Sequence, residues 1–183
     1  MILTRGMVVR IALLLIAGVV VQLGFLSHIS VLGGTPDVLP VLIVCLGLLG
    51  GAVIGAVCGF SIGLLVDSAL LQTLGVSSLV LLAVGYLAGR YRETFALTNP
   101  LVPPALAAAL TLFGAFAFGA IQLMLGVEAP ISLLILREIL VQTLLSFVLA
   151  IPVFPAVRWL LRPALVDGTP QRRPRIRGLM RAA

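Results

Sequence analysis

The chain carries no charged residue between Asp37 and Asp67, and long apolar segments lie on both sides of this stretch. Only 10% of the 183 residues are charged and 61% are hydrophobic, whereas about a quarter of the residues in a soluble domain are charged. Long apolar segments separated by short polar gaps indicate an integral membrane protein that is built from helices. The sequence therefore predicts an all-α fold, with one transmembrane domain over residues 1–162.

Four membrane spans are predicted directly, at residues 9–26, 74–89, 103–125 and 131–151. The apolar stretch 36–66 allows two interpretations. A single helix of this length would measure about 46 Å at about 1.5 Å per residue, which is well beyond the roughly 30 Å hydrocarbon core. Two helices, 36–49 and 51–66, would each be short and would turn at Gly50-Gly51.

The distribution of arginine, which supplies all twelve positive side chains, favours the two-helix interpretation. With six spans, one side of the membrane carries the arginines at residues 5 and 10, those at residues 90 and 92, and all of those from residue 158 onward. The predicted loops 27–35, 67–73 and 126–130 carry none. The positive-inside rule then places both termini in the cytoplasm. Prolines are expected to end or kink the sixth span, followed by an interfacial segment 156–162 and a disordered basic tail 163–183.

Charge and motifs exclude several functional classes. A net charge of +6 would suggest nucleic acid as partner of a soluble protein. Here the arginines lie at the ends of apolar segments, so anionic lipid is the expected partner and nucleic acid is not. The only histidine, His28, has no companion at metal-ligand spacing, and Cys45 and Cys58 lie inside apolar segments. We expect no catalytic residue, metal or cofactor.

Small residues recur at four-residue spacing in three predicted spans. Such stripes let helix backbones approach closely in a membrane. They either hold a partner's helix or pack within the bundle, and packing is the favoured interpretation. The positions are Gly51, Gly55, Gly59, Gly63, Gly85, Gly89, Ala107, Thr111, Ala115 and Gly119.

Four charged residues near the predicted outer boundary are candidates for a functional role. Asp37 precedes the second span, where a carboxylate suits the helix dipole. Asp67 ends the third span, where its charge opposes that dipole. Arg137 and Glu138 lie inside the sixth span, where each charge costs about 2.5–3.5 kcal/mol. Asp67 is a candidate partner for Arg137, and snorkelling of Arg137 to the headgroups is the alternative.

Several motifs resemble the family of the rod-shape-determining protein MreD. They are the "PD" at Pro36-Asp37, the "GFSIGLLVD" at residues 59–67 and the "GYLAGR" at residues 85–90. The resemblance is best over residues 35–92. It implies a six-helix bundle like the substrate-binding subunits of energy-coupling-factor transporters, and a component of the cell-elongation machinery that is not an enzyme.

The resemblance also implies partners. These are the transmembrane helix of MreC and, directly or indirectly, the synthase RodA with its class B penicillin-binding protein. The family is thereby expected to connect MreB filaments to peptidoglycan synthesis. The alternative hypothesis is a vitamin-binding subunit of an energy-coupling-factor transporter. The oligomeric state stays open, a homodimer included.

Overall fold

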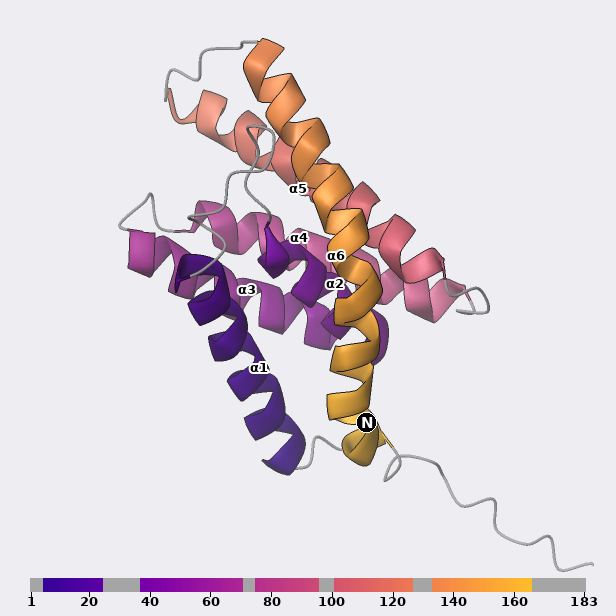
Figure 1. Cartoon of the computed structure of the whole chain (residues 1–183). Helices are drawn as coiled ribbons and strands as arrows, with labels where there is room; N and C mark the ends of the chain where they lie inside the picture. The colour runs from indigo at the N-terminus through magenta and orange to yellow at the C-terminus, as the bar shows by residue number, and fades with distance from the viewer. Residues whose placement is uncertain (1–4, 25–36, 71–74, 96–100, 127–132, 166–183) are drawn as a thin grey trace, which may run out of the picture.

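The computed structural model describes residues 5–24, 37–70, 75–95, 101–126 and 133–165, and it confirms the predicted all-helical membrane fold (Figure 1). Three of the helices contain apolar segments that are long enough to cross a membrane: all of α3, all of α5, and residues 137–161 of α6. The six helices of the described chain are α1 (Arg5–Gly24), α2 (Val38–Gly50), α3 (Ala52–Leu70), α4 (Val76–Thr94), α5 (Val102–Met124) and α6 (Leu133–Leu165).

The short helix α2 is the centre of the bundle. Every residue from Leu39 to Leu49 is buried, and α2 contacts all five other helices. With 13 residues, α2 is only about 20 Å long, which is less than the hydrocarbon core of a bilayer. Its enclosure relieves the mismatch, because its sides meet protein in place of lipid. The core consists of α2 side chains and of the apolar faces turned toward them.

The predicted turn at Gly50-Gly51 is confirmed, because α2 ends at Gly50 and α3 begins at Ala52. Gly51 has a φ of 96°, which an L-residue with a side chain rarely adopts. Its backbone N–H donates to the carbonyl oxygen of Gly47 at 2.8 Å. The chain thus reverses within one residue, and α2 and α3 form a hairpin.

Three helices extend several residues beyond their predicted ends. α3 continues to Leu70, four residues beyond the predicted span. α4 continues to Thr94, five residues beyond the predicted span. The charged residues near its carboxyl end are therefore part of the helix. α6 continues to Leu165 through Pro152 and Pro155, so the prolines do not end this helix near residue 151. Neighbouring helices can compensate for backbone bonds that proline removes in a membrane helix. The continuation packs on the bundle, since Val157 and Leu161 are buried in the core. Most of the predicted tail lies outside the described residues.

Candidate functional site

The small residues of α3 lie against α4, and these two helices share the most extensive contact among the described helices. A Cβ atom added at Gly55 would overlap the carbonyl oxygen of Gly85, and one at Gly59 would overlap that of Leu81. A Cβ at Gly63 would overlap the backbone of Ser78. Backbone atoms cannot move aside as a flexible side chain can. Glycine at these positions is therefore required by the packing of α3 on α4.

The facing glycines of α4 are equally enclosed. A Cβ at Gly85 would overlap the carbonyl oxygen of Gly55, and one at Gly89 would overlap the backbone of Gly51 and Ala52. On α2, Gly47 also lies against Gly85. The backbones of α2, α3 and α4 thus meet at glycine, and the chain's own α4 occupies the glycine stripe of α3.

The small-residue stripe of α5 is different, because only its first half is enclosed. Ala107 and Thr111 are buried, whereas Ala115 and Gly119 are half-buried. A Cβ atom at Gly119 would meet no atom of the described residues within 4 Å. The Ala115–Gly119 half of the stripe therefore presents small residues on a surface that the described helices leave open.

The amino end of α2 is capped twice. The Oδ1 atom of Asp37 accepts a hydrogen bond from the backbone N–H of Leu39 at 3.1 Å. The Oε1 atom of Gln22, on α1, accepts one from the N–H of Val38 at 2.9 Å. The first N–H groups of a helix have no partner within the helix. These two side chains satisfy that need at a half-buried helix end.

The structure explains the position of Asp67, whose charge opposes the dipole of its own helix. Asp67 is fully buried, and its Oδ2 atom accepts a hydrogen bond from the N–H of Gly75 at 2.8 Å. Gly75 is the N-cap residue of α4, so the carboxylate lies at the positive end of the next helix. Its Oδ1 atom and the hydroxyl of Ser78 are buried without a hydrogen-bond partner among the described residues.

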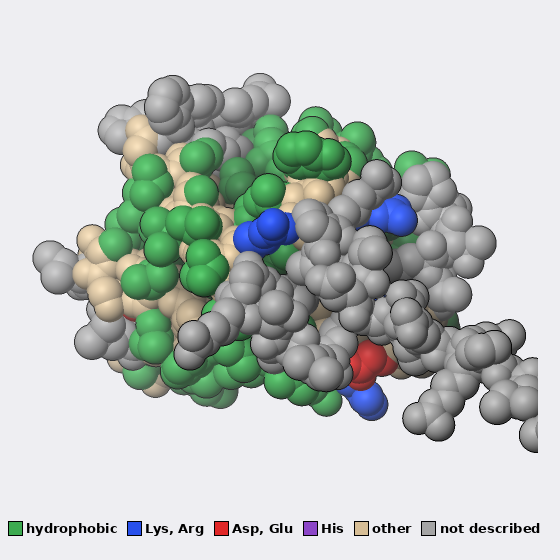
Figure 2. All heavy atoms as spheres, turned by 90° about the horizontal axis from the view of Figure 1, so that it is seen from below, with side chains coloured by type: hydrophobic (Ala, Val, Ile, Leu, Met, Phe, Trp, Pro, Cys, Tyr) green, Lys and Arg blue, Asp and Glu red, His purple; other side chains and the backbone are tan. Residues whose placement is uncertain are grey.

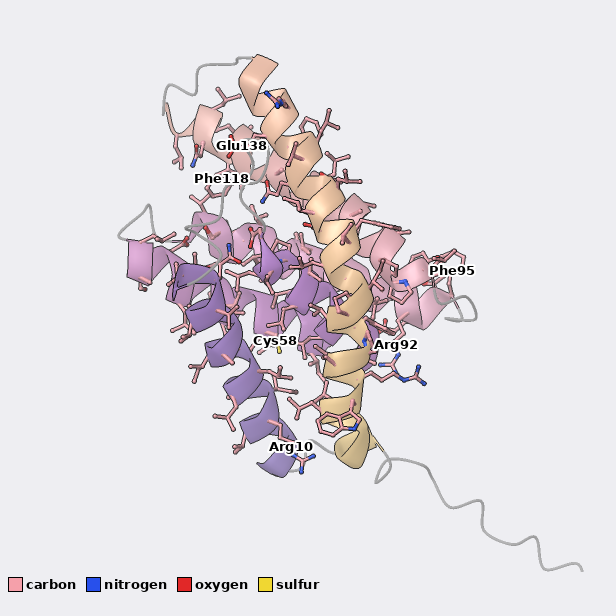
Figure 3. All side chains as sticks on the ribbon, viewed as in Figure 1. Arg10, Cys58, Arg92, Phe95, Phe118 and Glu138 are labelled. Carbon is pink, nitrogen blue, oxygen red and sulfur yellow. The ribbon has the colours of Figure 1, made fainter. Side chains whose placement is uncertain are left out.

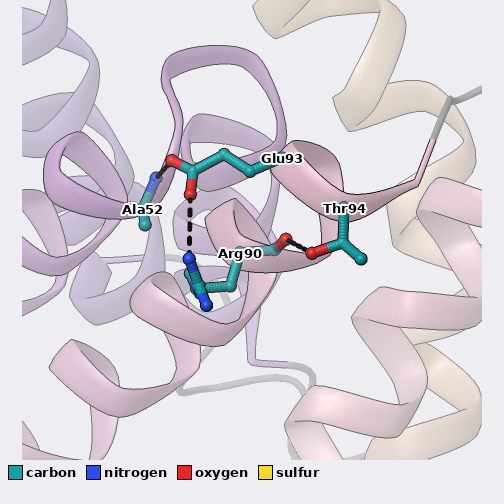
Figure 4. Close-up of polar contacts among 4 residues, drawn as sticks. All are labelled: Ala52, Arg90, Glu93 and Thr94. Carbon is teal, nitrogen blue, oxygen red and sulfur yellow. Dashed lines mark hydrogen bonds and ion pairs between the residues drawn. The ribbon is translucent and has the colours of Figure 1, made fainter.

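Two charged residues of α4 that the sequence analysis did not select hold the α2–α3 turn. The Oε1 atom of Glu93 accepts a hydrogen bond from the N–H of Ala52 at 3.1 Å, and its Oε2 atom lies 3.7 Å from the guanidinium of Arg90 (Figure 4). The guanidinium of Arg92 donates to the carbonyl oxygen of Leu49. The sequence indicates these contacts only indirectly. A Gly-Gly turn has no side chain of its own to cap the two helix ends that it joins.

A common pattern connects these contacts. Carboxylates lie at the amino ends of α2, α3 and α4, and they come from Asp37, Glu93 and Asp67 respectively. An arginine, Arg92, lies at the carboxyl end of α2. Each charge has the sign that stabilises the helix end it contacts. The charged side chains of this three-helix unit therefore stabilise the positions of its helices.

Glu93→Ala is expected to lower the free energy of unfolding by about 1 kcal/mol, the usual effect of removing a helix cap. Thermal unfolding of the purified protein in detergent measures this loss. Thr94→Ala is the matched control, because among the described residues the Thr94 hydroxyl bonds only to the Arg90 carbonyl of its own helix. Equal melting temperatures for the two variants would show that the Glu93 cap has no effect on stability.

Arg137 and Glu138 are both exposed on α6. The hypothesis that Arg137 pairs with Asp67 is not supported, because among the described residues no ion pair joins them and α6 does not contact α3. The physical reason is that α5 and α2 are the main neighbours of α6. His28 lies outside the described residues.

Comparison with family models identifies one match, to the rod shape-determining protein MreD, over residues 3–164. Comparison with curated proteins and with solved structures found no match. The family match covers nearly all of the described helices, including the α2–α3–α4 unit with its glycine contacts and helix caps. The chain therefore belongs to the MreD family of rod shape-determining proteins.

Proposed function

We propose that this protein is a membrane scaffold of the cell-elongation complex, without catalytic activity of its own, and that it binds the transmembrane helix of MreC. Membership of a rod-shape family supports a role in cell shape. The docking site is chosen because some of the small-residue positions are enclosed within the bundle and others are open. Those of α3 and α4 are enclosed by each other, while the Ala115–Gly119 half of the α5 stripe is open.

The Ala115–Gly119 surface has the character of a helix-docking site. Small residues four positions apart let two membrane helices approach closely, which increases their van der Waals contact. Phe116 is 58% exposed and Leu123 is 52% exposed on the same helix. These large side chains would flank the close approach and pack against the sides of an incoming helix. We therefore place the MreC helix along the outer half of α5.

The proposed orientation has both termini in the cytoplasm of a bacterium, with the protein in its inner membrane. Arg10 and Arg92 lie toward the lower end of the bundle, and Glu138 lies near its upper end (Figure 3). Seen from below, basic side chains and an acidic one lie among the hydrophobic side chains of the described residues (Figure 2). An arginine-bearing end of this kind fits the cytoplasmic leaflet and its anionic lipids. RodA and its class B penicillin-binding protein are proposed partners of the same assembly.

Gly119→Leu is expected to reduce the amount of MreC that co-purifies in detergent at least tenfold, because the larger side chain blocks the close approach of the two helices. The bundle itself is expected to keep its melting temperature, since this position has open space around it. Quantitative mass spectrometry of the purified complex measures the MreC content.

Gly24→Leu is the matched control, because a Cβ at Gly24 also meets no atom of the described residues within 4 Å and Gly24 lies on a different helix, α1. It is expected to leave MreC binding unchanged. Full MreC recovery with Gly119→Leu would rule out this docking site. Recovery of a transporter ATPase and its coupling subunit in place of MreC would contradict the scaffold function and favour vitamin transport.

A further inference from the structure

A buried carboxylate and a buried hydroxyl lie between α3 and α4. Asp67 and Ser78 are both fully buried. One carboxylate oxygen of Asp67, Oδ2, accepts a hydrogen bond from the N–H of Gly75. The other oxygen, Oδ1, and the Ser78 hydroxyl have no hydrogen-bond partner among the described residues. Buried polar groups in proteins are nearly always paired, so these two oxygens are available to a ligand.

The two side chains lean toward each other. The glycine contacts described above occur in opposite order along α3 and α4, so the two helices are antiparallel. Asp67 lies opposite Gly75. Gly63, one turn earlier on α3, lies opposite Ser78, because a Cβ added there would overlap the Cα of Ser78. Side chains of a helix lean toward its amino end. In this antiparallel pair, the oxygens of Asp67 and Ser78 therefore converge on one space.

This space has an excess of negative charge. No ion pair in the described part of the chain includes Asp67. The amino end of α4 carries the equivalent of about half a positive charge, which offsets only about half of the charge of the carboxylate. Arg137 is exposed on α6, and the described part of α6 does not contact α3. Because a charge away from water is stable only when it is paired, the remaining charge needs a cation from solution.

We propose that Asp67 and Ser78 bind a monovalent cation, and that sodium is the ion that they favour. A carboxylate and a hydroxyl supply the oxygen ligands that hard cations take. A divalent ion is disfavoured, because no group of three acidic, histidine or cysteine side chains that could hold a metal ion occurs among the described residues. The close approach of the α3 and α4 backbones at Gly63 favours the smaller sodium ion over potassium.

The site lies close to the ends of both helices. Asp67 is three residues before the end of α3, and Ser78 is two residues after the start of α4. Both are therefore within about 5 Å of a helix end along the helix axis. In the orientation proposed above, these ends face the outer side of the membrane, where sodium is supplied by the water. The bound ion holds the outer ends of α3 and α4 together. The site is separate from the α5 surface proposed for MreC, so failure of either proposal leaves the other intact.

Thermal unfolding of the purified full chain in detergent tests the site. Sodium chloride replaces choline chloride stepwise at constant ionic strength, and potassium chloride forms a second series. Sodium is expected to raise the melting temperature until it saturates, by roughly 3–6 °C at about fifteen times its dissociation constant, and potassium is expected to do so less. Equal melting temperatures in sodium and choline would overturn the proposal and leave water or a proton as the partner of Oδ1. Equal responses to sodium and potassium would contradict the preference for sodium.

Two variants assign the response to these residues. Asp67→Asn can still accept the Gly75 N–H but lacks the charge, and it is expected to lose the response to sodium. Ser78→Ala is expected to raise the half-saturating sodium concentration at least fivefold. The melting temperatures in choline show separately that each variant is folded. Sodium stabilisation that persists unchanged in Asp67→Asn would place the ion elsewhere and contradict the proposal.

Two matched controls are expected to keep the full response to sodium. Glu93→Gln removes a carboxylate that caps the opposite end of α3. Ser146→Ala removes a hydroxyl that is also buried and without a partner among the described residues, but that lies on α6, which contacts neither α3 nor α4 there. Binding of radioactive sodium to the parent protein, expected at one ion per chain, is a measurement that depends on no variant. A parent protein that binds no sodium would equally overturn the proposal.

Discussion

Gly59→Ala is expected to lower the free energy of unfolding by about 3 kcal/mol, near the upper end of what overpacking in a core usually costs. The added Cβ would overlap the carbonyl oxygen of Leu81 on the facing helix. That oxygen belongs to a helical backbone, so relief requires α3 and α4 to separate. Separation would weaken the packing of both helices along their length. Unfolding by heat or by a denaturing detergent measures the loss, with a drop in melting temperature of roughly 6–12 °C.

Gly119→Ala is the matched control for this prediction. Both glycines lie inside helices, so alanine improves helix propensity at each by about 1 kcal/mol. At Gly119 the added Cβ meets no atom of the described residues within 4 Å, and the variant is expected to be as stable as the parent or more so. If Gly59→Ala is also as stable as the parent, then the close α3–α4 packing described above is wrong.

Asp67→Ala is expected to lower the free energy of unfolding by about 2 kcal/mol, which is typical for loss of a hydrogen bond to a charged group. The substitution leaves the Gly75 N–H without its acceptor and opens a void at a fully buried position. It also removes the negative charge from the amino end of α4. Thermal unfolding in detergent measures the change. Asp67→Asn is expected to have a smaller effect, because its side-chain oxygen can still accept from Gly75.

Ser68→Ala controls for this substitution at the adjacent position. Ser68 is exposed, and within the described part of the chain its hydroxyl bonds only to the Leu64 carbonyl of α3, so its removal is expected to change stability little. If the Asp67→Ala and Ser68→Ala variants are equally stable, then the buried carboxylate does not stabilise the position of α4. If Asp67→Asn loses as much stability as Asp67→Ala, then the effect comes from the charge and not from the hydrogen bond.

The helices could be predicted because they follow from the order of apolar and charged residues along the sequence. Apolar length identified the membrane segments, and the arginine distribution split the stretch 36–66 at Gly50-Gly51, where the structure indeed turns. The end of α4 was not predictable in this way. The charges at residues 90–93 mark the end of an apolar span, but backbone hydrogen bonding continues through them to Thr94.

The caps between helices were harder to predict than the helices. Asp37 caps its own helix, so its role could be inferred from sequence position. Asp67 and Glu93 cap other helices, and only the folded arrangement shows which amide each one reaches. The same limit applies to the glycines. Four-residue spacing indicated that Gly59 and Gly119 allow close approach, but only the three-dimensional structure shows that one is enclosed and the other open.

The enclosure of α2 has a consequence for biogenesis. A segment of 13 residues is too short to be stable alone across a bilayer, and α2 reaches its final surroundings only when α1, α3, α4, α5 and α6 are all in place. α6 is the last of these to leave the ribosome. Ribosome-bound chains that stop before residue 133 therefore contain a central helix with one side still uncovered. The core of the protein is completed after insertion of its individual helices, at the time when α6 docks.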